Sequence, residues 1–228
     1  MTSSDEPVLL LSGAGLPSWI WEGTRELLAP RPTAVAPRPS RDGAALADYV
    51  EAALGAAPWE RFAVVAHSAG AVVAAELARR APERVRALLA VCAVVPRPGG
   101  SFVSSMPFPQ RHVLSLAMRF AGTRPPDSAI RRGLTTGLDD GTAERIVDAF
   151  VPEAVGLYRG QVGDGELRLP RGYVTTLEDR EIAPALQRRF AANLGSPWQA
   201  SLDTGHLPML EDTASFTRAV TRFLDARG

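Results

Sequence analysis

One serine in this chain stands in the local setting that nucleophilic catalysis requires. Ser68 lies between an apolar run, Phe62–Val65, and a helical pattern that begins after Gly70. This context matches the strand–turn–helix pattern G-x-S-x-G, with Ala66 in place of the first glycine. Small residues two positions before and after the serine let the strand and helix backbones approach closely. The pattern predicts an exposed nucleophile, whereas the simpler reading is a serine that caps an ordinary helix.

A serine hydroxyl is a weak nucleophile that needs an adjacent base, and the chain has three histidines. His67 is next to Ser68 in the turn, so we expect it to pack there instead of acting as the base. His112 falls in a segment without strand patterns and is expected at the surface or in a pocket. His206 follows the last predicted strand, in the loop Thr204–Pro208, and is the candidate base.

The acid that orients such a histidine should come between Ser68 and His206 in the sequence, at the end of a strand. Glu178 and Asp179 both follow the predicted strand at 172–176. Their spacing alone does not separate them. The alternative is that both belong to a solvated charge cluster at the start of a helix.

An oxyanion hole needs two preorganised N–H donors, and two turns can supply them. Ala69, directly after Ser68, is the first candidate donor, and Ala14, in the turn after the first strand, is the second. Gly13 and Gly15 flank Ala14 and would let the backbone approach a substrate, although a simple tight turn needs such glycines too. The pair lacks the third glycine and the downstream acid of a dinucleotide site.

Strands and helices must alternate along the chain to place these residues together. The pattern predicts strands at 8–11, 33–36, 62–65, 86–92, 172–176 and 198–202. It predicts helices at 17–28, 44–54, from 70 onward, 184–194 and 213–226. Gly55 and Gly195 are expected just past helix ends. This alternation predicts an α/β fold with a parallel sheet and helices on both faces.

Proline and glycine at 96–100 interrupt the alternation. The next stretch contains helical patterns at 111–120, 129–135 and 142–150 but no good strand. We therefore expect a core formed by residues 1–99 and 166–228, and a helical cap at 100–165. A cap there would cover the strand ends, where ligands bind in such sheets.

Composition restricts the partners. The 228 residues suit one α/β domain with an insertion, and the formal net charge is zero. A balanced charge gives no sign of a nucleic-acid partner. All 25 basic residues are arginine, which excludes lysine-based mechanisms. Cys92 is the only cysteine and lies in an apolar run, so we expect a buried thiol. No metal-spaced cluster and no cofactor motif is present in the sequence.

Nothing in the sequence predicts targeting to a membrane. Residues 1–7 lack the features of a signal peptide, and no apolar run approaches the roughly 18 residues of a membrane span. We expect a cytoplasmic protein with a small-molecule substrate and no membrane partner. The sequence is also compatible with a homodimer.

Four segments carry a family resemblance. Ser12–Gly15 with Trp19-Ile20-Trp21 resembles an H-G-A-x-x-x-x-W-x-W opening, and Pro96–Ser101 resembles a P-x-x-G-x-S segment. Tyr173–Asp179 with Gln187-Arg188 resembles an acid-bearing strand, and Gly205–Leu210 resembles a D-H-x-P-M loop. Together they resemble the α/β-hydrolase superfamily and, within it, plant methylesterases, hydroxynitrile lyases and their bacterial relatives.

The resemblance implies an α/β-hydrolase fold with a mostly parallel sheet and a small helical cap inserted after the sixth strand. It favours Asp179 over Glu178 as the acid. The chain differs in having Ser12 where the pattern has histidine, and Pro37–Ser40 where it has a glycine-rich loop. Hydroxynitrile lyases of this branch carry a lysine directly after the catalytic histidine, a position that Leu207 occupies here.

The sequence therefore predicts a serine hydrolase with a Ser68, His206 and Asp179 triad and no cofactor or metal. Leu207 and Met209 are expected to form an apolar wall of the substrate pocket, which suits a small apolar ester or thioester. The alternative is non-hydrolytic or C–C bond chemistry on a secondary metabolite, by a lyase, cyclase or decarboxylase with the same scaffold. A catalytically inactive binding protein is a third reading, which the intact triad disfavours.

Overall fold

The central sheet is entirely parallel in the computed structural model, which describes residues 6–39, 41 and 43–226. Its order is β2-β1-β3-β4-β5-β6. The strands are β1 (Val8–Leu11), β2 (Thr33–Val35), β3 (Phe62–His67), β4 (Val85–Val91), β5 (Arg171–Thr176) and β6 (Trp198–Leu202). This arrangement confirms the predicted α/β class and its six strand positions to within one or two residues.

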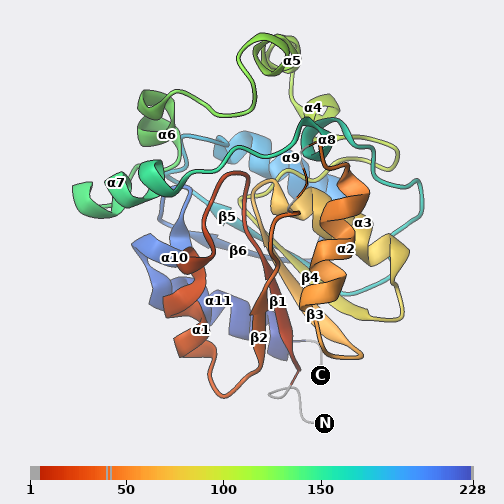
Figure 1. Ribbon diagram of the computed structural model, residues 1–228. Helices are drawn as coiled ribbons and strands as arrows, with labels where there is room; N and C mark the ends of the chain where they lie inside the picture. The colour runs from red at the N-terminus through yellow and green to blue at the C-terminus, as the bar shows by residue number, and fades with distance from the viewer. Residues whose placement is uncertain (1–5, 40, 42, 227–228) are drawn as a thin grey trace.

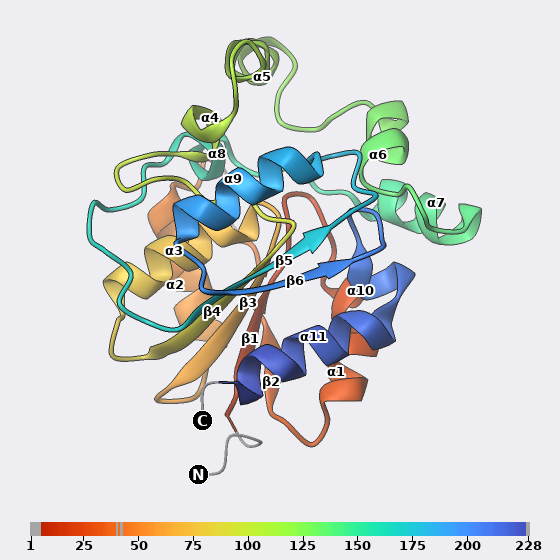
Figure 2. The ribbon, with the colours of Figure 1, turned by 180° about the vertical axis from the view of Figure 1, so that it is seen from behind.

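Helices cover both faces of the sheet (Figures 1 and 2). One face packs against α2 (Leu46–Ala56), α3 (Gly70–Arg80) and α9 (Pro184–Leu194). The other face packs against α1 (Glu22–Leu28) and α11 (Thr213–Asp225). Every residue of β1 and β3 is buried, because a parallel strand covered on both faces contacts apolar neighbours on each side. Alternate side chains of these strands therefore belong to two separate cores.

A helical insertion separates β4 from β5. It contains α4 (Phe102–Ser105), α5 (Gln110–Phe120), α6 (Asp127–Gly133), α7 (Asp140–Ala149) and α8 (Val155–Arg159). Figure 2 shows α4, α5, α6 and α8 above the sheet, with α6 and α7 on the side toward which the β5 and β6 arrows point. The insertion follows the fourth strand of this chain and not a sixth, because the described residues hold only three strands before β4.

Some local expectations were wrong. The segment predicted as one helix at 17–28 is a 3₁₀ helix, η2 (Ser18–Trp21), followed by α1. Gly55 lies inside α2, which continues to Ala56, instead of following its end. The loop after His206 contains a short helix, α10 (Pro208–Glu211). Gly195 does follow α9, with a left-handed φ of 62°, as predicted.

None of the helices in the described residues is both long enough and apolar enough to span a bilayer.

Candidate active site

Ser68 occupies a strained turn between β3 and α3. Its φ is 53°, a value that residues with a side chain seldom adopt. A Cβ placed on Gly70 would lie 2.7 Å from the Ser12 carbonyl oxygen and 2.9 Å from that of Leu11. The glycine two residues after Ser68 is therefore needed for α3 to pass close to β1. The turn presents Ser68 at the carboxyl end of β3.

The Ser68 hydroxyl lies within hydrogen-bonding distance of His206. The Ser68 Oγ to His206 Nε2 distance is 3.0 Å, and His206 Nδ1 lies 2.8 Å from Asp179 Oδ2. Because a carboxylate only accepts, Nδ1 carries the hydrogen and Nε2 can accept the Ser68 proton. The structure thus brings together the three residues that the sequence singled out, whereas Glu178 is exposed.

The Asp179 carboxylate is buried and surrounded by donors. Its Oδ1 accepts hydrogen bonds from the backbone N–H groups of Glu181 and Ile182, at 2.8 and 2.9 Å. Its Oδ2 also accepts from Thr176 Oγ1 at 2.9 Å and from Gln187 Nε2 at 3.0 Å. Burial alone would raise the pKa of Asp179, but the His206 ring and these hydrogen bonds lower it. Asp179 is therefore held ionised.

His206 is fully buried, which by itself disfavours its charged form. The Cys92 sulfur and the Asp179 carboxylate outweigh burial and raise the pKa of the His206 imidazole well above its ordinary value. Burial also raises the pKa of the Cys92 thiol, so this sulfur is uncharged near neutral pH. We therefore assign the raised pKa of His206 mainly to Asp179.

The two candidate donor residues, Ala14 and Ala69, lie at the same site. Ala14 and Ala69 line one cavity with Ser68. Within the described part of the chain, neither the Ala14 N–H nor the Ala69 N–H has a hydrogen-bond acceptor. Both groups are therefore available to a ligand oxygen placed beside Ser68.

This cavity has a volume of about 570 Å³ and runs from Ser68 under the helical insertion. Much of its wall is apolar and comes from the insertion and α9, with Phe102, Met106, Leu114, Met118, Phe150, Tyr158, Ile182 and Leu186 among its residues. Polar groups enter the wall at Gln110, Thr123, Arg124, Arg180 and Glu181. A small molecule with a substantial apolar part fits such a cavity.

Four residues expected near the substrate do not line this cavity: Gly13, Gly15, Leu207 and Met209. Leu207 and Met209 are buried in the core on the α11 face of the sheet, because α10 turns them inward toward that core. Gly13 packs against Ser68 and His67 and lines a smaller neighbouring cavity. A Cβ on Gly15 would overlap the Phe150 ring, so Phe150 covers this glycine.

Sequence reasoning missed several residues that shape the site. Gln187 was named in the resemblance, but its role was not: it donates a hydrogen bond to Asp179 and accepts one from the Thr176 N–H at 3.0 Å. The cavity wall in the insertion was missed too, because the apolar positions of a short helix do not indicate whether they face a core or a cavity.

His67, Cys92 and His206 offer ligand atoms within 4.8 Å of one another. Both ring nitrogens of His206 are already occupied by Ser68 and Asp179, so this trio does not suit a metal ion.

Solved structures with this architecture include several hydrolases. An extracellular alpha/beta-hydrolase from a Paenibacillus species superposes with a TM-score of 0.82, at 14% identity over 95% of this chain and 98% of that one. A pyrethroid hydrolase from Sphingobium faniae JZ-2 gives 0.74, at 19% identity over 97% and 98%. Polyneuridine aldehyde esterase gives 0.78, at 18% identity over 98% and 100%. At these identities the likeness establishes the fold.

Family membership rests on sequence. No curated protein sequence matches the chain. A family model described as the alpha/beta hydrolase family matches residues 8–219, which include every strand and the three residues Ser68, Asp179 and His206. The chain belongs to the alpha/beta hydrolase family.

Proposed function

We propose that this protein is a serine hydrolase that cleaves small, largely apolar carboxylic esters or thioesters through an acyl-enzyme. The observation that carries the proposal is the chain of hydrogen bonds from Ser68 through His206 to Asp179. Ser68, at one end of this chain, lines a largely apolar cavity. The esterase and the pyrethroid hydrolase among the structural relatives support the same reaction class.

The proposed reaction begins when Ser68 Oγ attacks the acyl carbon and His206 Nε2 takes the hydroxyl proton. Asp179 holds the Nδ1–H tautomer and stabilises the imidazolium that forms. The carbonyl oxygen becomes negative, and the N–H groups of Ala14 and Ala69 stabilise it. His206 then returns the proton to the leaving alcohol or thiol, which leaves an acyl group on Ser68.

A water molecule completes the proposed cycle. His206 removes a proton from this water as it attacks the acyl carbon, and the bond to Ser68 Oγ breaks. The proton returns to Ser68, and a carboxylic acid is released. No part of this sequence requires a cofactor.

The helical insertion, together with its flanking loops at 100–165, is the proposed cap. Its residues form much of the apolar wall around Ser68, so we propose that it selects the substrate. The size and polarity of this wall favour an acyl or alcohol group that is mostly hydrocarbon.

The decisive experiment is a panel of p-nitrophenyl esters and acyl thioesters of increasing acyl length, assayed with the wild-type protein and Ser68→Ala. Turnover by the wild type that is lost in Ser68→Ala is expected. If the folded wild-type protein turns over no ester or thioester, the hydrolase assignment fails. The non-hydrolytic alternative on the same scaffold would then account better for the site.

A further inference from the structure

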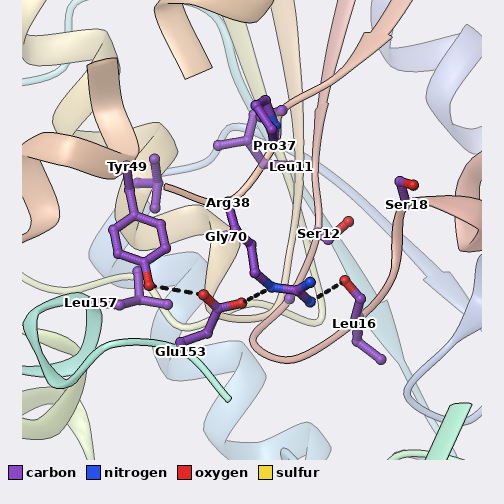
Figure 3. A pocket seen from close by; sticks show the side chains of 13 residues that line it. Leu11, Ser12, Leu16, Ser18, Pro37, Arg38, Tyr49, Gly70, Glu153 and Leu157 are labelled. Atoms are coloured by element: carbon purple, nitrogen blue, oxygen red, sulfur yellow. Dashed lines mark hydrogen bonds and ion pairs between the residues drawn. The ribbon is translucent and has the colours of Figure 1, made fainter. Parts of the chain in front are cut away.

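A buried carboxylate outside the triad holds the turn that carries Ala14. Glu153 lies between α7 and α8, and only 5% of its side chain is exposed. Its Oε1 accepts a hydrogen bond from the Gly15 N–H at 3.1 Å and forms an ion pair with Arg38 Nε at 2.5 Å. Its Oε2 accepts from the Tyr49 hydroxyl at 2.8 Å. Figure 3 shows Arg38 and Tyr49 on either side of this carboxylate.

The turn at 13–16 is held on several sides. The Leu16 N–H donates to the Gly13 carbonyl at 3.2 Å, and Gly15 has a φ of 77°, which suits glycine at the third position of a type II turn. The Val151 N–H donates to the Gly15 carbonyl at 3.1 Å. Arg38 Nη2 donates to the Leu16 carbonyl at 2.5 Å. Both backbone polar groups of Gly15 are therefore fixed by the segment that carries Glu153.

Arg38 and Tyr49 make this arrangement specific to a carboxylate. Arg38 lies in the loop after β2, and its guanidinium joins Glu153 to the backbone of the turn. Burial and the nearby charge of Glu153 raise the pKa of Tyr49 above its ordinary value, so the phenol stays protonated and donates. Hydrogen bonds to an ionised group are shorter and stronger than neutral ones. An amide at position 153 would keep the shape of the side chain but lose the ion pair.

We propose that Glu153 and Arg38 are positioning residues that hold the turn at 13–16 so that the Ala14 N–H faces the reacting carbonyl oxygen. This inference rests on the proposed hydrolase function. It adds a physical link between the helical insertion, which carries Glu153, and the oxyanion hole. An oxyanion donor acts on the charge that develops in the transition state more than on the bound substrate, so loss of positioning lowers kcat more than it raises KM.

The test measures kcat and KM for the best p-nitrophenyl ester in the wild type, Glu153→Gln, Arg38→Lys and Arg38→Ala. Removal of one oxyanion donor from a serine hydrolase costs about 10²–10³ in kcat, and this sets the upper limit for displacement of the turn. We expect Glu153→Gln to lower kcat by about tenfold or more, with KM changed by no more than about threefold. Arg38→Lys should retain more of kcat than Arg38→Ala, because the lysine keeps the charge beside Glu153.

A second measurement separates positioning from general damage. The rate constant for phosphonylation of Ser68 should fall in parallel with kcat in Glu153→Gln, because the phosphonate oxygen also uses the oxyanion hole. Glu144→Gln is the matched control, since it removes a carboxylate from an exposed ion pair with Arg131 in the same insertion. This variant should leave kcat unchanged. If Glu153→Gln does not fold, the two Arg38 variants carry the test.

The outcomes distinguish the two proposals. If the wild type turns over esters and both Glu153→Gln and the Arg38 variants keep its kcat, the positioning role is refuted and the hydrolase function stands. Equal losses of kcat in Glu144→Gln and Glu153→Gln would also refute a specific role. If the wild type neither turns over an ester nor reacts with the phosphonate at Ser68, both proposals fail.

Discussion

The Nε2–H of His67 donates a hydrogen bond of 2.8 Å to the backbone carbonyl of His206. The residue directly before the candidate nucleophile therefore holds the main chain of the candidate base. The Cys92 thiol donates to the same carbonyl at 3.3 Å. Burial, reinforced by the His206 charge, lowers the pKa of His67 to about 3, so this ring stays neutral over the range in which hydrolases are assayed. The pKa of His206 is shifted in the opposite direction, well above its ordinary value.

The first prediction concerns pH. Protonated His206 cannot accept the Ser68 proton, and its pKa is raised, so the inactive form persists to higher pH than for a free histidine. We expect kcat/KM to rise with pH through one ionisation whose midpoint lies above about 6.5. Asp179→Asn should move the midpoint of the residual activity down, because it removes the charge that favours the imidazolium. A flat profile from acid to neutral pH would exclude a histidine base.

The second prediction concerns the nucleophile. A fluorophosphonate probe should label the wild-type protein at Ser68. Ser68→Ala should abolish both labelling and ester turnover, because no other hydroxyl in the described structure is hydrogen-bonded to the His206 ring. Ser201→Ala changes an exposed serine on β6 and serves as the control that labels normally. Peptide mass spectrometry identifies the labelled residue. Labelling of Ser68→Ala at another serine would contradict the assignment.

The third prediction separates two adjacent acids. Asp179→Asn keeps the shape of the buried side chain but favours the wrong tautomer of His206, which in serine proteases costs about 10⁴-fold in kcat. Glu178→Gln changes an exposed side chain and should keep kcat within a few-fold of the wild type. Steady-state kinetics on one ester compares them directly. A larger loss in Glu178→Gln would mean that the acid is the neighbouring residue.

The fourth prediction uses two glycines with opposite surroundings. A Cβ on Gly55, inside α2, would meet no atom within 4 Å, so Gly55→Ala should stabilise the protein by about 0.5–1 kcal/mol.

Gly13 is the crowded member of the pair. A Cβ on Gly13 would lie 2.8 Å from both His67 Nδ1 and Ser68 Cβ, so Gly13→Ala should displace Ser68 and abolish turnover. Thermal unfolding and ester assays read out the two effects. Normal turnover by Gly13→Ala would show that the turn tolerates the added methyl group.

The fifth prediction separates ester hydrolysis from cyanohydrin cleavage. The chain has no lysine, and Leu207, directly after His206, is fully buried in the core. A departing cyanide would therefore find no cation at that position, and an unpaired anion in a desolvated pocket is costly. Assays with a short-chain activated ester and with mandelonitrile should give Ser68-dependent ester turnover without cyanide release. Cyanide release that disappears in Ser68→Ala would contradict this expectation.

The strands, and the candidate residues Ser68 and His206, could be identified from the sequence because their signals are local. The run at Phe62–Val65, the small residues around Ser68 and the loop containing His206 each carry their own pattern. The parallel order then requires that the carboxyl ends of β3, β5 and β6 lie along one edge. The choice between Glu178 and Asp179 needed more than spacing. The structure shows the reason, since the carboxyl group of Asp179 is enclosed by Thr176 and Gln187.

The cavity wall and the contacts that hold the turn at 13–16 could not be predicted in this way. Glu153 contacts Gly15 across 138 positions of sequence, and no periodicity marks such a pair. Leu207 and Met209 were misplaced because a loop was expected where α10 forms and turns both side chains into the core. The sequence pattern predicted helices close to α5, α6 and α7. It did not predict their positions relative to the sheet.

The sheet order also determines when Ser68, Asp179 and His206 can first come together during synthesis of the chain. Chains emerge N-terminus first, and domains fold as units once their sequence is complete. Ser68 follows β3, in the first third of the chain, whereas Asp179 and His206 follow the last two strands. β5 must pair with β4 across the whole helical insertion, and such long-range pairings form slowly. Under the proposed hydrolase mechanism, a nascent chain that ends before His206 therefore holds Ser68 without its base, and it cannot cleave an ester until the last strands close the sheet.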